Sequence, residues 1–238
     1  QNLSGTVCRL PNGLPIVRPN TSSFSDETLF GYGEIFQNEV YLKHGIVLTK
    51  GDCIFDVGAN IGLFSLFVHK NVEDATIYAF EPMPPTFESL QVNVNMHKLR
   101  AKIFNCGLSA HTQTASFTYY PGLTGLSGHV IGEESVRALI KLIAENRLKS
   151  WIQASPLRTH DANLIQQVKM ALEKNYHLHP ESIFSETYEC PLRTLSEIIR
   201  EHNVERIDLL KVDVEGSEVD VLAGIEEKDW PKIKQIVL

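Results

Sequence analysis

Long hydrophobic runs are missing from this sequence. None of the apolar stretches in its 238 residues approaches the ~20 residues that a membrane-spanning helix needs, so we expect no membrane partner. The first residues, Gln1–Thr6, contain neither the basic region nor the apolar region of a secretory signal. We therefore expect a cytoplasmic protein.

Cysteine is scarce, and the four cysteines lie far apart, at Cys8, Cys53, Cys106 and Cys190. They form neither a C-x-x-C pair nor a Cys/His cluster with the spacing of a zinc site. We expect them to be reduced and to pack as small hydrophobic residues. We also expect no metal site, since the chain lacks an evident third ligand near its best-placed carboxylates.

Blocks of basic charge are absent as well. The formal net charge is −7 and the two signs are interspersed, so nucleic acid is not an expected partner. With 43% hydrophobic and 21% charged residues, the composition is typical of a soluble globular protein. The length suits one α/β domain with an insertion.

Short apolar runs alternate with helical patterns along most of the chain. This alternation predicts an α/β fold, Rossmann-like and doubly wound, with a mainly parallel sheet. The expected strands are Cys53–Val57, Thr76–Phe80, Lys102–Cys106, Thr114–Tyr120, Ile207–Val212 and Gln235–Leu238, and the expected helices are Leu63–Val68, Thr86–Met96 and Thr194–His202.

We expect a single domain, 1–238, built from three parts. Residues 1–50 form an N-terminal helical cap, and residues 51–120 and 190–238 form the cofactor-binding core. Residues 121–189 form a helical insertion with helices at Glu133–Lys149 and Asn163–Tyr176. We interpret this insertion as a lid over a site; a decorative surface insertion is the alternative. Because the sequence stops inside an apolar run, we expect further sheet elements beyond Leu238.

A glycine-rich turn follows the first expected strand. Gly58, Ala59, Asn60 and Gly62 leave room for a cofactor to approach the backbone. Asp56 stands where it can receive the ammonium group of a methionine moiety. In dinucleotide folds the corresponding turn binds a pyrophosphate, which a carboxylate would repel.

Phe80 is the last residue of the second expected strand, and Glu81 follows it directly. A carboxylate about twenty residues past the turn can accept hydrogen bonds from both ribose hydroxyls. Glu81 alone fits an adenosyl cofactor or NAD, whereas Glu81 together with Asp56 favours S-adenosylmethionine, which is converted to S-adenosylhomocysteine. The alternative is that both carboxylates only cap strand ends.

The third strand ends at Asn105–Ser109, which we expect to face the adenine. Asn105 and Ser109 can hydrogen-bond the base while Gly107 leaves room, although the same residues also make ordinary loops.

Asp213 and Glu215 follow a central strand at its carboxyl end, where ligands bind in open α/β sheets. Glu215 is our candidate acid–base residue, and Asp213 is expected to border the cofactor. We interpret Glu218 as a partner of the helix dipole.

Methylation of an aliphatic hydroxyl needs a base. His129 ends a glycine-rich loop where the insertion begins, so it is a candidate catalytic residue; a solvated loop histidine is the alternative. His44, His160 and His177 follow as further candidates.

Three segments, Phe55–Phe64, Phe80–Pro82 and Leu210–Glu218, resemble the FkbM-type methyltransferases. Segments Glu27–Phe36 and Tyr41–Ile46 resemble the N-terminal cap of members embedded in polyketide and nonribosomal peptide synthases. The resemblance implies O-methylation of a hydroxyl, on a substrate tethered to an acyl or peptidyl carrier protein. It places Asp56, Gly58, Asn60, Gly62 and Glu81 on the cofactor, and Asp213 and Glu215 beside the transferred methyl.

Three other interpretations remain. The first is a free-standing O-methyltransferase of a sugar or small metabolite. The second is an NAD-dependent oxidoreductase, against which the missing G-x-G-x-x-G pattern argues. The third is a non-catalytic scaffold domain.

Overall fold

The computed structural model describes residues 5–20, 25–121, 124 and 185–238. His129 and the two expected helices Glu133–Lys149 and Asn163–Tyr176 lie outside the described residues. None of the described helices is long and apolar enough to cross a membrane.

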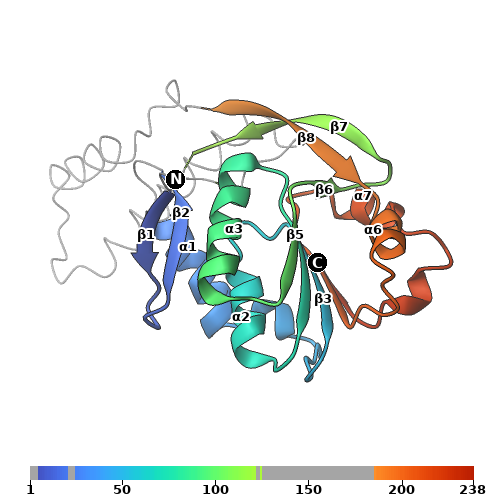
Figure 1. Cartoon of the computed structure of the whole chain (residues 1–238), viewed down its shortest axis with the longest axis horizontal. Helices are drawn as coiled ribbons and strands as arrows, with labels where there is room; N and C mark the ends of the chain where they lie inside the picture. Colours follow the sequence, from blue (N-terminus) through green and yellow to red (C-terminus); the bar gives the residue numbers. More distant parts are fainter. Residues whose placement is uncertain (1–4, 21–24, 122–123, 125–184) are drawn as a thin grey trace, which may run out of the picture.

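The central sheet is parallel throughout its five strands, in the order β10-β9-β3-β4-β5 (Figure 1). Its strands are β3 (Cys53–Val57), β4 (Thr76–Phe80), β5 (Ala101–Phe104), β9 (Leu209–Val212) and β10 (Ile236–Val237). From β3 the chain winds outward through β4 and β5, and later returns to the other side of β3 through β9 and β10. The strand order therefore reverses between β3 and β9, which is where open α/β sheets bind ligands. The predicted fold class is confirmed.

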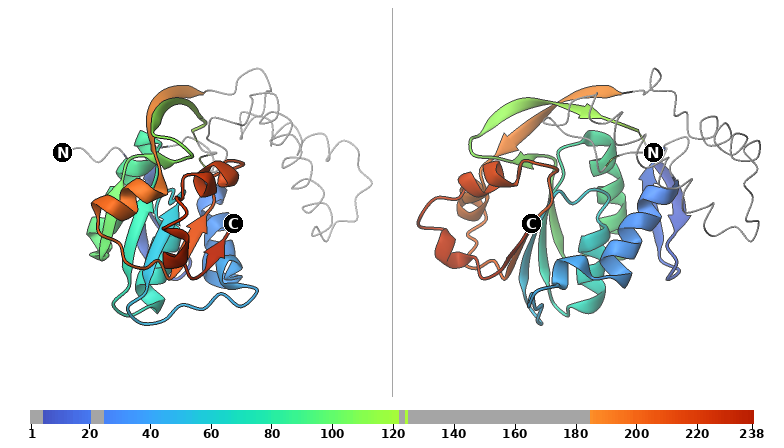
Figure 2. Two further views of the ribbon diagram at one scale, coloured as in Figure 1. Left: turned by 90° about the vertical axis from the view of Figure 1, so that its right-hand side faces the viewer. Right: turned by 180° about the vertical axis from the view of Figure 1, so that it is seen from behind.

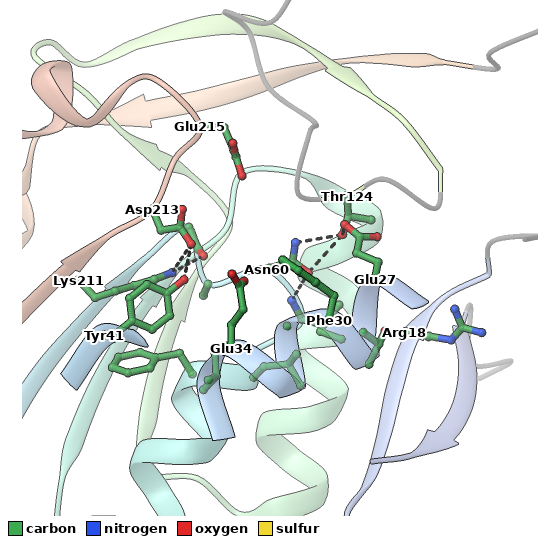
Figure 3. Close-up of a pocket in the computed structure, with 18 of the residues that line it drawn as sticks. Arg18, Glu27, Phe30, Glu34, Tyr41, Asn60, Thr124, Lys211, Asp213 and Glu215 are labelled. Carbon is green, nitrogen blue, oxygen red and sulfur yellow. Dashed lines mark hydrogen bonds and ion pairs between the residues drawn. The ribbon is translucent and has the colours of Figure 1, made fainter. Parts of the chain in front are cut away.

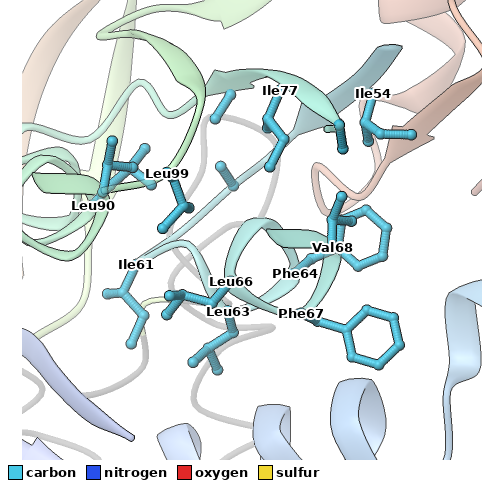
Figure 4. Close-up of a cluster of buried hydrophobic side chains, with 14 of the residues drawn as sticks. Ile54, Ile61, Leu63, Phe64, Leu66, Phe67, Val68, Ile77, Leu90 and Leu99 are labelled. Atoms are coloured by element: carbon cyan, nitrogen blue, oxygen red, sulfur yellow. The ribbon is translucent and has the colours of Figure 1, made fainter. Parts of the chain in front are cut away.

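Helices cover both faces of this sheet (Figures 1 and 2). One face packs on α2 (Leu63–Asn71) and α3 (Pro84–His97), through a cluster that includes Ile54, Ile77 and Leu90 (Figure 4). The other face packs on α6 (Leu195–Glu201) and α7 (Glu218–Ala223). Residues alternate between these two clusters along each strand, as the pleat requires. A short 3-10 helix, η4 (Trp230–Lys232), precedes β10.

Among the described residues of the N-terminal part, the expected helical segment of the cap is present from Ser25 onward, and the turn-rich stretch before it forms a hairpin that was not predicted. This hairpin is antiparallel and consists of β1 (Gly5–Arg9) and β2 (Pro15–Pro19). Gly13, with φ 85°, supplies the left-handed residue of the turn. Next come α1 (Ser25–Tyr32), the π-helix η1 (Gly33–Gln37) and the 3-10 helix η2 (Val40–Leu42).

Asn93 fastens this hairpin to the core. Its side chain is buried on α3; it accepts a hydrogen bond from Val17 N and donates to the carbonyl oxygens of Val17 and Ile61. Because Ile61 belongs to the turn after β3, one side chain holds the cap, α3 and the turn together.

A second, three-stranded sheet arches over one edge of the core (Figure 1). It consists of β6 (Gly107–Leu108), β8 (Glu186–Arg193) and β7 (Gln113–Tyr119), in that order. β7 lies close to its predicted bounds but pairs antiparallel with β8, outside the parallel sheet. β8 was not predicted, and it crosses the expected boundary between insertion and core at 189/190.

Candidate active site

The turn after β3 is bent by three residues in the left-handed region, namely Gly58 (φ 75°), Asn60 (φ 50°) and Gly62 (φ 89°). The backbone N–H groups of Gly58 and Ala59 both donate to Phe80 O, which binds the turn to the end of β4. A Cβ atom on Gly58 would lie 1.9 Å from Asp213 O. The absent side chain at Gly58 therefore makes room for the backbone after β9, a reason that the sequence did not indicate.

Glu81 holds the same turn from the other side. Its carboxylate accepts hydrogen bonds from Asn60 N at 2.9 Å and from Met83 N at 3.0 Å, and the residue is only 6% exposed. Burial raises the pKa of Glu81 to about 7, although the two backbone hydrogen bonds oppose the shift. A carboxylate oxygen has two acceptor positions, so each oxygen can still accept from a ligand hydroxyl.

Two cavities meet at the reversal point of the sheet. The first, which we call the cap lobe, measures about 200 Å³ and lies between η1, α1, β2 and the turn (Figure 3). The second, the sheet lobe, measures about 120 Å³ and lies between the end of β4, β6 and the β7–β8 pair. Because both are lined by Gly58, Asn60, Thr124, Asp213 and Glu215, they are two parts of one crevice.

Asp56 lies behind the turn and lines neither lobe. It is 0% exposed, accepts a hydrogen bond from Ser65 Oγ at 2.7 Å, and its Oδ1 lies 3.2 Å from Lys211 Nζ. Oδ1 makes no hydrogen bond within the described residues, so the ion pair with Lys211 is what offsets the burial of its charge. The expectation that Asp56 receives the ammonium group of a methionine moiety does not match this position.

Lys211 is the central cation beneath the crevice, and the sequence reasoning missed it. Asp56 and Lys211 are register partners on β3 and β9, so their side chains project on the same face. Lys211 Nζ also donates to Gly58 O at 2.8 Å and lies 3.8 Å from Asp213 Oδ2. A lysine inside the apolar run Leu209–Val212 is the signal that could have revealed it, because a buried lysine needs a partner.

Tyr41, from the cap, completes this network (Figure 3). Its hydroxyl donates to Asp213 Oδ2 at 2.5 Å, and its ring lies 5.2 Å from Lys211 Nζ. Burial and the Asp213 carboxylate raise the pKa of Tyr41 far above its usual value. The phenol therefore stays protonated and fixes one oxygen of Asp213.

Glu215 borders both lobes, in a left-handed backbone conformation (φ 55°). Partial removal from water, followed by the neighbouring Asp213 carboxylate, raises the pKa of Glu215 to about 7. Glu218 is not in the crevice lining; it accepts hydrogen bonds from Val214 N and Gly216 N and so supports the loop that carries Glu215.

Of the residues expected to contact the adenine, two line the sheet lobe and one does not. Gly107 and Ser109 line the sheet lobe. Asn105 does not, because its amide donates to Glu81 O and Pro82 O, each at 3.0 Å. Phe80 lines the sheet lobe and stacks on Phe104. Gly62 lines neither lobe, and a Cβ there would meet Leu90 Cδ1 at 2.7 Å.

Two acidic residues of the cap, Glu27 and Glu34, also line the cap lobe. Neither was predicted from the sequence as a site residue. Glu27 accepts a hydrogen bond from Thr124 Oγ1 at 3.1 Å, and Asn60 donates to the same hydroxyl. Within the described ranges, no group of three or more His, Cys, Asp and Glu side chains could hold a metal ion.

A parallel sheet that reverses at β3 and β9, with a glycine turn after β3 and a carboxylate after β4, is the α/β fold of class I methyltransferases. Residues 56–238 match the family model described as the methyltransferase FkbM domain. The chain therefore belongs to the FkbM methyltransferase family, and this family generally uses a cofactor of the S-adenosylmethionine type.

Three relatives illustrate the range of the family. The chain is 35% identical over 229 residues to "31-O-demethyl-FK506 methyltransferase FkbM" of Streptomyces tacrolimicus, covering 96% of this chain and 79% of that protein. It is 35% identical to "AMB antimetabolite synthetase AmbE" of Pseudomonas aeruginosa, over 96% of this chain but 10% of the synthetase. It is 33% identical to "Methyltransferase sdnD" of Sordaria araneosa, over 89% of this chain and 74% of that protein.

Proposed function

We propose that this chain is an S-adenosylmethionine-dependent O-methyltransferase whose acceptor is a hydroxyl of a polyketide or peptide intermediate on an acyl or peptidyl carrier protein. The observation that carries the proposal is Glu81, a buried carboxylate held by two backbone N–H groups at the rim of the sheet lobe. The name of the Streptomyces relative, a 31-O-demethyl-FK506 methyltransferase, supports oxygen as the acceptor atom, and the synthetase relative supports a tethered substrate.

The described residues suit an adenosyl group in the sheet lobe. Glu81 has free acceptor positions for the two ribose hydroxyls. Met83, Leu108, Phe117 and Leu192 give the lobe apolar walls for a purine, and Ser109 offers a hydroxyl. When bound, S-adenosylmethionine supplies a methyl group that its sulfonium makes electrophilic.

Glu215 is our candidate for the base, since His129 lies outside the described residues. A carboxylate whose pKa is about 7 can take a proton from an acceptor hydroxyl near neutral pH. Glu215 borders both lobes, so it can face the acceptor while the sheet lobe holds the adenosyl group. Tyr41 and Lys211 hold the adjacent Asp213 in one orientation.

Calorimetric titration of S-adenosylhomocysteine tests the cofactor. We expect micromolar binding by the intact chain, no binding of NAD, and a loss of at least about tenfold in Glu81→Ala. Glu88→Ala, on the exposed side of α3, is the matched control and should bind as the parent does. Tight binding of NAD, or Glu81→Ala binding like the parent, would contradict the assignment.

The acceptor is tested with one 3-hydroxyacyl group presented on a carrier protein and as a free acid. With isotopically labelled S-adenosylmethionine, nuclear magnetic resonance identifies the atom that carries the new methyl group. We expect an O-methyl product from the carrier-bound form. Methylation of the free acid alone would favour a free-standing enzyme of small metabolites, and an N- or C-methyl product would refute O-methylation.

A further inference from the structure

If the cap lobe binds the methionine end of an adenosyl cofactor, it also binds the positively charged α-ammonium group. The α-ammonium group of that moiety binds most strongly to a carboxylate, through a charge-assisted hydrogen bond. Asp56 is excluded, because it is fully buried, bound by Ser65 and Lys211, and absent from the crevice lining. The carboxylates that line the cap lobe are the remaining candidates.

Four carboxylates line the cap lobe. Two of them have partners within the protein, and a third borders both lobes. Asp213 is held by Tyr41 and lies 3.8 Å from Lys211. Glu27 accepts a hydrogen bond from Thr124. Glu215 borders the sheet lobe as well, which suits a position beside the acceptor. The fourth is Glu34.

Glu34 differs from Asp213 and Glu27 in its contacts, and from Glu215, which is exposed, in its burial. It is half-buried on η1, and its carboxylate makes no hydrogen bond or ion pair with any residue that the structure describes. Figure 3 shows it pointing from η1 toward the turn after β3, between Asp213 on one side and Asn60 on the other. Burial and the negative charge of Asp213 raise the pKa of Glu34. A cation at this position would relieve both effects.

The local backbone also sets Glu34 apart. It lies in a five-residue π-helix, Gly33–Gln37, and π-helical turns are frequent at functional sites. Phe36 on the same turn stacks on Tyr32 and meets the edge of Phe67 on α2. These ring contacts anchor the turn to the core, so the carboxylate is presented from a packed element.

We propose that Glu34 is the carboxylate that binds the α-ammonium group of S-adenosylmethionine. This inference rests on the proposed function. It assigns to the cap, outside the family match of residues 56–238, a direct contact with the cofactor.

The test uses two ligands, S-adenosylhomocysteine and its deaminated analogue, which keeps the carboxylate and lacks the amino group. Calorimetry is performed on the parent chain, on Glu34→Gln and on Glu39→Gln. Glu39 is exposed on the same cap and lines neither lobe. We expect Glu34→Gln to weaken S-adenosylhomocysteine by at least about tenfold, to leave the deaminated analogue as tight or tighter, and Glu39→Gln to change neither ligand.

Two results would overturn the inference while leaving the proposed function intact. One is an unchanged affinity of Glu34→Gln for S-adenosylhomocysteine. The other is an equal loss for both ligands, which would mean that Glu34 supports the shape of the lobe. If the parent chain binds neither ligand, the proposed cofactor itself is wrong, and this outcome is distinct from both.

Discussion

At the scale of single residues, the charge balance beneath the crevice depends on one lysine. Lys211 is 2% exposed and compensates Asp56, which is 0% exposed. We expect Lys211→Met to lower the free energy of unfolding by about 3–5 kcal/mol, because it leaves a buried carboxylate without a cation to pair with. Denaturation in urea measures this loss.

The matched control is the double variant Asp56→Asn with Lys211→Met. Removing both charges should restore a large part of the lost stability. A double variant no more stable than Lys211→Met alone would show that Lys211 acts mainly through its contacts with Gly58 O and Tyr41.

Glu215 is expected to control the pH dependence of methyl transfer. A base acts in its ionised form, and the pKa of Glu215 is about 7. We therefore expect kcat to be low at pH values below about 7 and to rise as the pH increases through this value. Glu215→Gln should lower kcat by about 10²–10⁴-fold and remove this step, with little change in the affinity for S-adenosylhomocysteine. The exposed Glu227 provides a control as Glu227→Gln. An unchanged pH profile in Glu215→Gln would identify another base.

The sequence predicted which segments meet at the site better than it predicted what each side chain does. Gly58, Glu81, Asp213 and Glu215 all border the crevice as expected. Asp56 is buried beneath the crevice, where it is paired with Lys211 on the neighbouring strand. That pairing joins residues 155 positions apart in the chain, 56 and 211, and local patterns do not report it.

At the scale of elements, the turn after β3 is fixed by close packing against the end of β9. We expect Gly58→Ala to lower the stability by about 3 kcal/mol or more. A methyl group in the left-handed region costs about 1–2 kcal/mol, and overpacking against Asp213 O adds about 1–3 kcal/mol.

Gly51→Ala is the control for backbone strain alone. Gly51 also has a positive φ, 79°, but a Cβ there meets nothing within 4 Å, so we expect only the loss of about 1–2 kcal/mol. Equal losses in the two variants, measured by urea denaturation, would contradict the role of the Gly58–Asp213 contact.

The strands of the parallel sheet could be predicted because they are buried on both faces and read as continuous apolar runs. The hairpin β1–β2 was missed although Asn12–Gly13, a strong hairpin signal, lies at its turn. β8 was missed because Pro191 interrupts it and a proline argues against a strand. The expected helices of residues 121–189 stay predictions.

At the scale of the whole molecule, the ionisation of Glu81 in the core lowers the free energy of unfolding near neutral pH. Its pKa is about 7 in the folded protein, against an ordinary value of 4.5. The raised pKa stabilises the fold below pH 4.5, and this contribution is lost as the pH rises to about 7. We expect the parent chain to lose stability relative to Glu81→Gln across this interval, by up to about 1.4 kcal/mol per unit of pKa difference.

Urea denaturation of both chains at several pH values measures this difference. Comparison with Glu81→Gln cancels the other carboxylates, including Glu215, that titrate in the same interval. A stability difference between the two chains that stays constant with pH would mean that Glu81 is ionised throughout.

Tyr119 and Glu186 are direct partners at the open end of the β7–β8 pair. Two residues that are 67 positions apart in the chain are thus neighbours, and the strands that hold them together also line the sheet lobe through Phe117 and Leu192. The cost of closing a chain segment grows only slowly with its length. Tyr120 is buried and Thr124 lines both lobes, so we expect changes in chain length between Thr124 and Glu186, rather than at these two residues, to leave the ladder and the crevice intact.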